Sequence, residues 1–130
     1  MDTFSIPIKL NDSFEGFAES KGLLLLKNGA VIIQFQTKDA ILGMVKSDLK
    51  TVDIPLENLI EISYKKSIFG NKLILLVDNL SFVEQLPSSD SNEIVLSIAR
   101  KDIDTAIDLV RALKLDQSEK EYQAALKEVE

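Results

Sequence analysis

The side chains that most often carry out chemistry near neutral pH are missing from this sequence. Its 130 residues include no histidine and no cysteine. The commonest general base, the usual thiolate nucleophile and the commonest nitrogen and sulfur metal ligands are therefore absent. The five glycines do not form a phosphate-binding loop or a dinucleotide fingerprint, and there is no Gly-x-Ser-x-Gly elbow. We therefore expect no catalytic residue and no cofactor.

Carboxylates are the remaining candidates for acid–base or metal chemistry. The chain has 21 acidic residues, but none is paired at a telling spacing within an apolar strand. Asp90, Asn92 and Glu93 offer the oxygen ligands that calcium prefers, yet this segment lacks the glycine and the distal glutamate of a calcium-binding loop. We interpret it as a solvated connection. The sequence predicts a protein that is not an enzyme and has no metal site.

One turn between two strand-like segments carries cations around apolar side chains. Lys65, Lys66 and Lys72 surround Ile68 and Phe69, and we call these five residues the lysine turn. Such a turn can enter a lipid interface, with its apolar groups inserted and its ammonium groups at the phosphates. It can equally contact a protein, or Phe69 can fold back onto the sheet. Three lysines contribute only about 1 kcal/mol each near an anionic surface, which is weak anchoring.

Charge and composition exclude further classes of partner. The net charge of −6 and the pI near 4.7 oppose nucleic acid and anionic bilayers at long range. The chain has only two arginines, Arg100 and Arg111, and no aromatic platform beside its lysines, so we expect no nucleic-acid binding. The first twenty residues show no secretion signal, and no apolar run approaches the roughly 18 to 20 residues of a membrane-spanning helix. With no cysteine as well, the expected location is the cytoplasm.

The N-terminal residues 1–19 have the pattern of an arm. Phe4, Ile6 and Ile8 alternate with polar residues and Pro7 at the two-residue period of a half-buried strand. Because proline has no backbone donor, we expect this strand at an edge of a sheet. The edge could belong to the same domain or to a neighbouring copy, so these three apolar residues are also the candidate assembly arm.

Strand patterns follow one another through residues 20–115, which we predict to be one domain. Asn28-Gly29 is the dipeptide best suited to a type I′ turn and predicts a hairpin. Phe35 is expected to point inward. Residues 72–78 are apolar on both faces and predict a central strand, whereas residues 79–86 fit either a short strand or a turn of helix. The predicted strands are 22–27, 30–36, 40–47 with a bend at Gly43, 51–55, 59–66, 72–78 and 93–99.

The apolar period changes to about three and a half residues after residue 102. Asp102 is a suitable N-cap, and Ile103, Ile107 and Val110 are expected to be buried against the sheet, with Ala106 and Leu113 on the same arc. Residues 116–130 form a polar tail. There, Ser118 and Glu121 have capping-box spacing, and Tyr122, Leu126 and Val129 make a thin apolar stripe. We therefore expect a second helix that is frayed or depends on a partner.

The order of these segments resembles the bacterial pleckstrin-homology-like (PH-like) domains, which are related in fold to GRAM domains. The resemblance is carried by GLLLLKNGAVIIQFQ, DIPLENLIEISYKK, SIFGNKL, the Leu86-Pro87 pair and IVLSIARKDIDTAIDLVRAL. It implies a mainly β protein with α: a bent antiparallel β-sandwich or partly open barrel, capped by a C-terminal helix. Relatives that bind phosphoinositides use basic residues around the first hairpin loop. Here the corresponding turn has Lys27 alone, so we expect no phosphoinositide site.

The sequence thus predicts a non-catalytic binding or scaffold module that acts through protein contact or self-assembly, with a homo-oligomer as one form. The alternative is peripheral binding to anionic lipid through the lysine turn. Both hypotheses assign the function to a contact surface, because the sequence shows no motif of reactive side chains.

Overall fold

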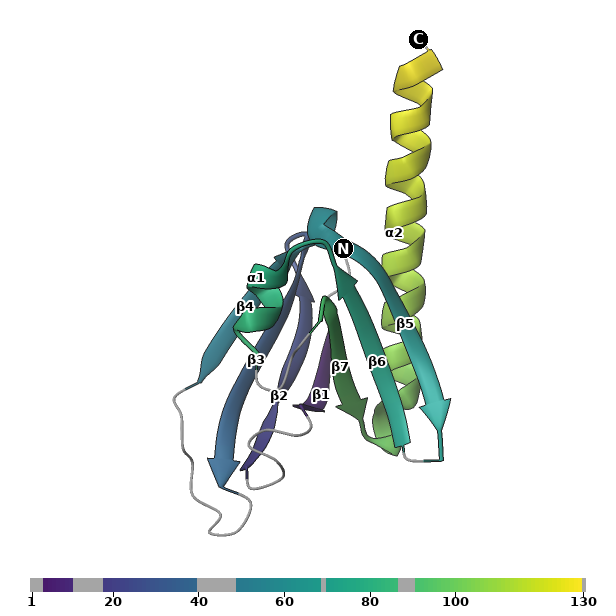
Figure 1. The fold of residues 1–130 in the computed structure, drawn as a ribbon. Coiled ribbons are helices and arrows are strands. Elements are labelled where there is room, and N and C mark those ends of the chain that lie inside the picture. Colours follow the sequence, from purple (N-terminus) through teal and green to yellow (C-terminus); the bar gives the residue numbers. More distant parts are fainter. Residues whose placement is uncertain (1–3, 11–17, 40–48, 69, 87–90, 130) are drawn as a thin grey trace.

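Seven strands form one antiparallel sheet, and a long helix follows them in the chain (Figure 1). The structure, a computed structural model, describes residues 4–10, 18–39, 49–68, 70–86 and 91–129. The strands are β1 (Phe4–Leu10), β2 (Ala18–Lys27), β3 (Ala30–Asp39), β4 (Lys50–Pro55), β5 (Leu59–Ser67), β6 (Gly70–Val77) and β7 (Glu93–Ile98). The helical elements are the 3₁₀ turns η2 (Leu56–Asn58) and η3 (Arg100–Asp102), the short α1 (Leu80–Glu84) and the long α2 (Ile103–Val129).

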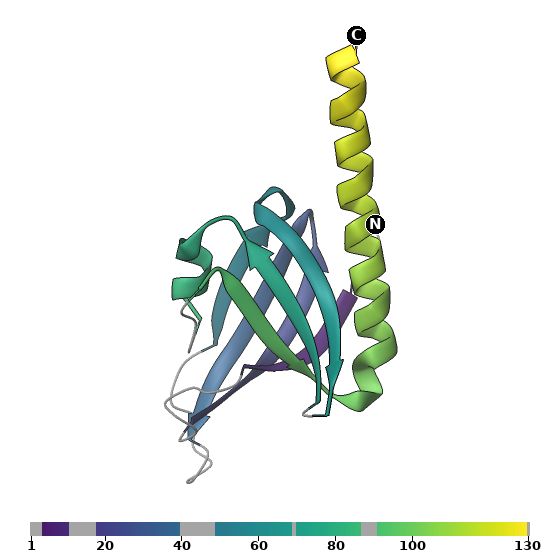
Figure 2. The same cartoon turned by 45° about the vertical axis from the view of Figure 1, so that its right-hand side comes forward.

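The strand order is β4-β3-β2-β1-β7-β6-β5, so the sheet consists of two meanders placed side by side. They meet where β1 lies next to β7, and among the described residues only Lys9 and Ser97 are paired across this seam. β4 and β5 are neighbours in sequence but form the two ends of the sheet. The sheet is strongly curved and does not close into a barrel (Figure 2).

The hairpin between β2 and β3 confirms the prediction from Asn28-Gly29. Asn28 has a φ of 52° and Gly29 a φ of 75°, the two positive values that a type I′ turn requires. The pairing runs without interruption from the turn to the far end of both strands. Each strand also extends beyond the predicted range, because β2 begins at residue 18 and β3 ends at residue 39.

The expectation that the first strand lies at an edge is wrong, because β1 is interior, between β2 and β7. The register explains how Pro7 is accommodated. Lys27 and Ala30 flank the two-residue turn as a hydrogen-bonded pair, and such pairs alternate along the ladder, so Leu23 directs its backbone groups to β3. The pair Pro7–Leu23 is therefore not hydrogen-bonded. The nitrogen of Pro7 faces β7, where the seam has almost no ladder to interrupt.

Most of the other predicted elements are confirmed. The strands predicted at 51–55, 59–66, 72–78 and 93–99 correspond to β4, β5, β6 and β7, and β6 lies between two partners. Of the two alternatives for 79–86, the structure has the helical one. Its helix α1 is capped by Asn79, whose Oδ1 accepts a hydrogen bond of 2.9 Å from the N–H of Ser81. The strand predicted at 40–47 lies outside the described residues.

A single hydrophobic core joins both meanders and the helix. Phe35, predicted to point inward, is buried, and so are the alternating apolar residues of every strand. Its largest fully buried side chains are Phe35, Ile6, Leu24, Ile33, Ile54, Ile62, Leu73, Leu75, Ile94, Leu96, Leu109 and Leu113. The two halves of the sheet are therefore held together mainly by side-chain packing, since the backbone pairing between them is sparse.

The face by which α2 packs on the sheet differs from the predicted one. The helix contacts β5 and β1, and its buried residues are Ala106, Leu109, Val110 and Leu113, which have the i, i+3, i+4, i+7 spacing of one face. Ala106, Val110 and Leu113 lie on the predicted arc and are buried, whereas Ile103 and Ile107 are only half-buried, so the face is rotated toward Leu109. The 3₁₀ turn η3 precedes the helix, so Asp102 lies inside this turn, and its N–H donates to the carbonyl of Ala99 at 2.9 Å.

The predicted break between two C-terminal helices is absent, because α2 runs uninterrupted for 27 residues. No glycine or proline lies between residues 103 and 130, so the strongest helix-breaking residues are absent from this segment. Lys120 Nζ also lies 3.4 Å from Asp116 Oδ2, an i, i+4 ion pair across the expected break. Ser118 and Glu121 are consequently interior helical residues and not a capping box.

Candidate functional site

The second half of α2 leaves the sheet and extends away from the domain (Figure 1). Every residue from 118 to 128 is exposed. The last hydrogen bond that the described structure shows between this helix and the sheet is donated by Gln117 Nε2 to the carbonyl oxygen of Leu59, at 2.9 Å. Beyond this point Glu119 still lines a groove with residues of the sheet, and the described side chains that follow are all exposed.

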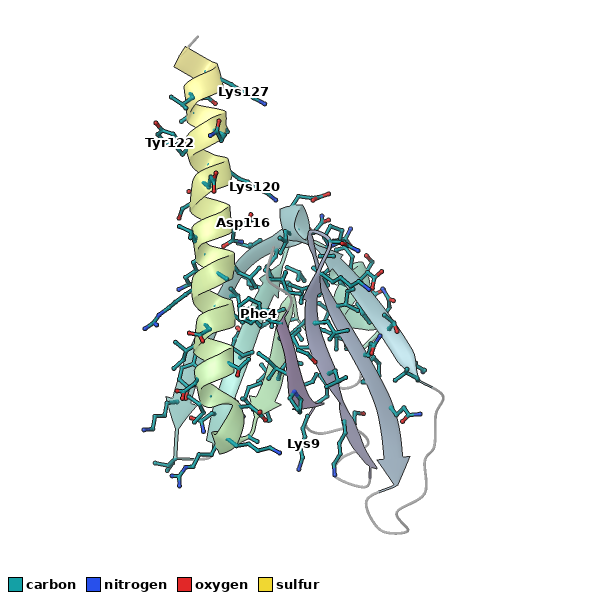
Figure 3. All side chains as sticks on the ribbon, turned by 180° about the vertical axis from the view of Figure 1, so that it is seen from behind. Phe4, Lys9, Asp116, Lys120, Tyr122 and Lys127 are labelled. Atoms are coloured by element: carbon teal, nitrogen blue, oxygen red, sulfur yellow. The ribbon has the colours of Figure 1, made fainter. Side chains whose placement is uncertain are left out.

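The apolar face of α2 changes sides at the point where the helix leaves the sheet. At 100° per residue, Leu115, Tyr122 and Leu126 lie within an arc of about 40°, and we call these three residues the outward stripe. Their arc is about 170° from the centre of the face that packs on the sheet. Figure 3 shows Tyr122 pointing away from the sheet, while Lys120 and Lys127 lie on the other side of the helix. Among the described residues, the sheet therefore lies on the opposite side of the helix from most of the outward stripe, and it comes near the stripe only at Leu115.

The exposure of the outward stripe is large for apolar side chains. Leu115 is 70% exposed, Tyr122 61% and Leu126 41%. A single exposed apolar residue is ordinary, but three on one helical face, seven and four residues apart, are more than scattered exposure. This surface is the candidate contact site of the protein.

A shallow groove of about 210 Å³ lies at the base of the outward stripe. Phe4 from the start of β1 forms one wall together with Leu26 and Leu56, and α2 forms the other. The helical wall consists of Ala112, Leu113, Leu115, Asp116 and Glu119. The apolar surface of the helix thus continues from the outward stripe into a recess beside the sheet.

The lysine turn forms the tip of the β5–β6 hairpin. Lys65 pairs with Lys72 in the register, and Ser67 pairs with Gly70. Lys65 and Lys66 are exposed and Lys72 is half-buried. Ile68 is 93% exposed, so it packs on no part of the described structure. Phe69 lies outside the described residues, and its predicted alternatives remain predictions.

The candidate assembly arm is part of the domain's own sheet. Ile6 is fully buried, Ile8 is 3% exposed and Phe4 is half-buried against the core. Of the two alternatives for this strand, pairing within its own domain is the one present. Ile6 and Ile8 are therefore not available to a neighbouring copy, whereas Phe4 also lines the groove beside α2.

A second pocket, of about 390 Å³, lies at the seam between β1 and β7. Most of its lining surface is apolar. The lining includes Pro7, Ile8, Gly22 and Ile98, together with Lys9 and Lys21. Both lysines already take part in interactions. The lining also includes the polar Asn71 and Ser97, and Asn71 Oδ1 already accepts a hydrogen bond of 2.6 Å from the hydroxyl of Tyr64.

Reactive constellations are absent from the part of the chain that the structure describes. No group of three or more histidine, cysteine, aspartate or glutamate side chains there could hold a metal ion. In the calcium-like segment, Asn92 is engaged with the carbonyl of Val77 through its Nδ2 at 3.1 Å, Glu93 is exposed, and Asp90 is not described. None of the described helices is both long and apolar enough to cross a membrane.

Reasoning from the sequence located part of the outward stripe but not its direction. Tyr122 and Leu126 were identified, whereas Leu115 was assigned to the end of the packing helix. The missed signal is the interval of seven residues from Leu115 to Tyr122, which places both on one face only if the helix continues through residues 116–118.

Comparisons with models of protein families, with curated proteins and with solved structures find no significant match to this chain.

Proposed function

We propose that this protein is a non-catalytic binding module that contacts a protein partner through the outward stripe of α2. One observation carries the proposal: the second half of a 27-residue helix is exposed, with its apolar residues facing away from the domain. A free helical segment of this length is marginal in water. A partner surface would stabilise it by covering the stripe.

The available apolar surface is of the right size for a modest interaction. Full burial of a leucine or similar side chain contributes about 1.5 to 3 kcal/mol. Weighted by the present exposure of Leu115, Tyr122 and Leu126, covering the stripe contributes roughly 3 to 5 kcal/mol. The entropy lost on association offsets a large part of this favourable free energy. Tight binding therefore requires a further contribution from the groove beside Phe4 or from a second contact.

We also propose that the domain is PH-like. Three features support this assignment: a four-strand meander and a three-strand meander in one curved antiparallel sheet, a helix after the last strand, and a core shared by all of them. Fold does not determine function, so the binding proposal depends on the stripe and not on the resemblance.

Site-specific photo-crosslinking in cells tests the binding proposal. A photoreactive residue replacing Tyr122 is expected to form discrete adducts with polypeptide, while the same residue replacing Ala124 is the matched control. Ala124 is exposed on the opposite side of the same helix. Adducts from position 122 and not from position 124 support the proposal. Equal yields from both positions, or none from either, overturn it.

A second candidate function is peripheral binding to anionic lipid, and the exposure of Ile68 among lysines favours it. From Ile62 to Val77 the sequence contains no acidic residue, so the β5–β6 tip is locally cationic although the whole chain is acidic. Flotation with vesicles containing phosphatidylserine tests this function, and Ile68→Asp is the disruptive variant. The control is Leu80→Asp, which places the same charge at an exposed apolar residue outside the β5–β6 hairpin. Binding that is insensitive to salt, or equal in both variants, excludes this function.

A further inference from the structure

The residues along the outward face of α2 have the spacing of a coiled-coil seam. Leu115, Glu119, Tyr122 and Leu126 follow one another at intervals of four, three and four residues, which is the heptad alternation of positions d and a. A seam of this kind packs against another helix, because its side chains insert between four residues of the facing helix. A helix is the partner shape that fits this spacing.

The one charged residue in the seam selects between the arrangements of two identical helices. In a parallel, in-register pair, Glu119 would face Glu119 of the second copy, and like charges would meet in the apolar layer. In an antiparallel pair, Glu119 faces Tyr122 of the second copy, whose hydroxyl can donate a hydrogen bond to the carboxylate. The same register places Leu115 against Leu126 of the second copy. The seam is thus complementary to itself only when the helices run in opposite directions.

We propose that the partner of the outward stripe is a second copy of this chain, bound through an antiparallel pairing of the two C-terminal helical halves. This inference rests on the proposed function and names its partner. The flanking positions agree with it, because Asp116 comes beside Gln123 of the second copy and Ser118 beside Ala125. No like charges meet there, and the carboxylate of Asp116 is already paired with Lys120 at 3.4 Å.

The placement of the domains leaves room for this pairing. Each sheet lies on the face of its own helix that is opposite the stripe (Figure 3). In an antiparallel pair the two sheets therefore lie on the outer sides of the helix pair and at opposite ends of it. The contact has only four seam layers. We therefore expect it to bury much less area than the roughly 800 Å² per partner of a standard interface. Association is accordingly expected between micromolar and millimolar concentration.

Sedimentation velocity of the full chain from about 10 μM to 1 mM tests the pairing. The wild-type chain is expected to shift from monomer to dimer across this range. Leu126→Glu, which places a charge in the outermost layer, should weaken the dimer more than tenfold. Ala124→Glu adds the same charge on the opposite face and should leave it unchanged. A chain that stays monomeric, or equal effects of the two substitutions, overturns the inference.

The direction of the helices is tested with spin labels at single cysteines, which the natural chain lacks. Glu121→Cys and Glu128→Cys occupy equivalent positions outside the seam, seven residues apart. In the antiparallel pair the two labels at position 121 are at the same height, whereas those at position 128 are offset along the axis by about 22 Å. A parallel pair gives equal distances at both positions, and this result contradicts the proposal.

The same cellular crosslinking separates failure of this inference from failure of the binding proposal. Adducts from position 122 with twice the mass of the chain agree with pairing between copies. If position 122 yields only adducts with a different polypeptide and the purified chain is monomeric, the second copy is not the partner, although the stripe still binds protein. If position 122 yields no specific adduct, both proposals are wrong.

Discussion

Gln117 donates a hydrogen bond of 2.9 Å from its Nε2 to the main-chain oxygen of Leu59. Leu59 opens β5, an end strand of the sheet, and its carbonyl meets the helix where α2 passes the rim of the domain. This bond separates two parts of one helix. Before it, the side chains that face the sheet are buried. After it, residues 118 to 128 are exposed.

Replacing Gln117 by alanine is expected to lower the free energy of unfolding by about 0.5 to 1.5 kcal/mol. This is the usual net contribution of one intramolecular hydrogen bond, and the carbonyl of Leu59 would lose this partner. Urea denaturation followed by circular dichroism measures the change. Gln123→Ala, on the exposed part of the helix, serves as the control and should differ from the natural chain by less than about 0.5 kcal/mol. Equal values for the two variants would show that the bond contributes nothing.

Two apolar substitutions in the first half of α2 should differ in cost. Leu109 is 1% exposed and Ile107 is half-buried. Leu109→Ala is expected to destabilise the domain by about 2 to 5 kcal/mol, because it removes core contacts and leaves a cavity. Ile107→Ala should cost about 1 kcal/mol, since much of its side chain already contacts water. Chemical denaturation of both variants checks the order, and a larger loss for Ile107 would mean that the helix is rotated relative to the sheet.

Gly22 should tolerate no side chain. A Cβ at this position would overlap the carbonyl oxygen of Gln34 and lie 2.8 Å from the Cα of Phe35, both on the neighbouring strand β3. Gly22→Ala must therefore displace backbone and is expected to cost about 1 to 3 kcal/mol or more. Gly29→Ala is a useful comparison, because its Cβ meets no atom within 4 Å and its cost, about 1 kcal/mol, comes from the φ of 75° alone. Thermal unfolding of the pair separates steric overlap from backbone strain.

The outward stripe should contribute little to the stability of the monomer. Because Tyr122 and Leu126 contact no part of the sheet, Tyr122→Ala with Leu126→Ala is expected to change the free energy of unfolding by less than about 0.5 kcal/mol. The measurement belongs at a concentration of a few micromolar, where association is negligible. A loss comparable to that of Leu109→Ala would indicate that the second half of α2 folds back onto the domain.

Local patterns predicted most of the strands because they act over a few residues. Asn28-Gly29 determines its own turn, and the alternation in residues 93–98 follows from one buried face. The position of β1 in the sheet could not be inferred in this way. Pro7 excludes pairing on one side only, and whether that side faces solvent or a sparse seam depends on β7, which is distant in sequence.

The helix shows the same division between local and distant causes. The period after Asp102 predicted that a helix packs there, but the rotation that buries Leu109 and leaves Ile103 half-buried depends on contacts with β5 and β1, which are distant in sequence. Its continuation past residue 116 agrees with the absence of glycine and proline there, and the capping-box spacing of Ser118 and Glu121 occurs inside the helix. For the candidate site, sequence reasoning found the apolar residues but could not show that they face away from the sheet.

The seam between β1 and β7 has a consequence for how this chain folds. Each meander can form from hairpins that are local in sequence. The contacts between the meanders are not local, because Lys9 pairs with Ser97 and α2 packs on β1 as well as on β5. Contacts of such long sequence separation form slowly. During synthesis the first four strands leave the ribosome before residues 103–113 have been made. We expect their apolar face to be exposed to solvent during this interval, because the helix cannot yet cover it. Such exposed apolar surface favours aggregation.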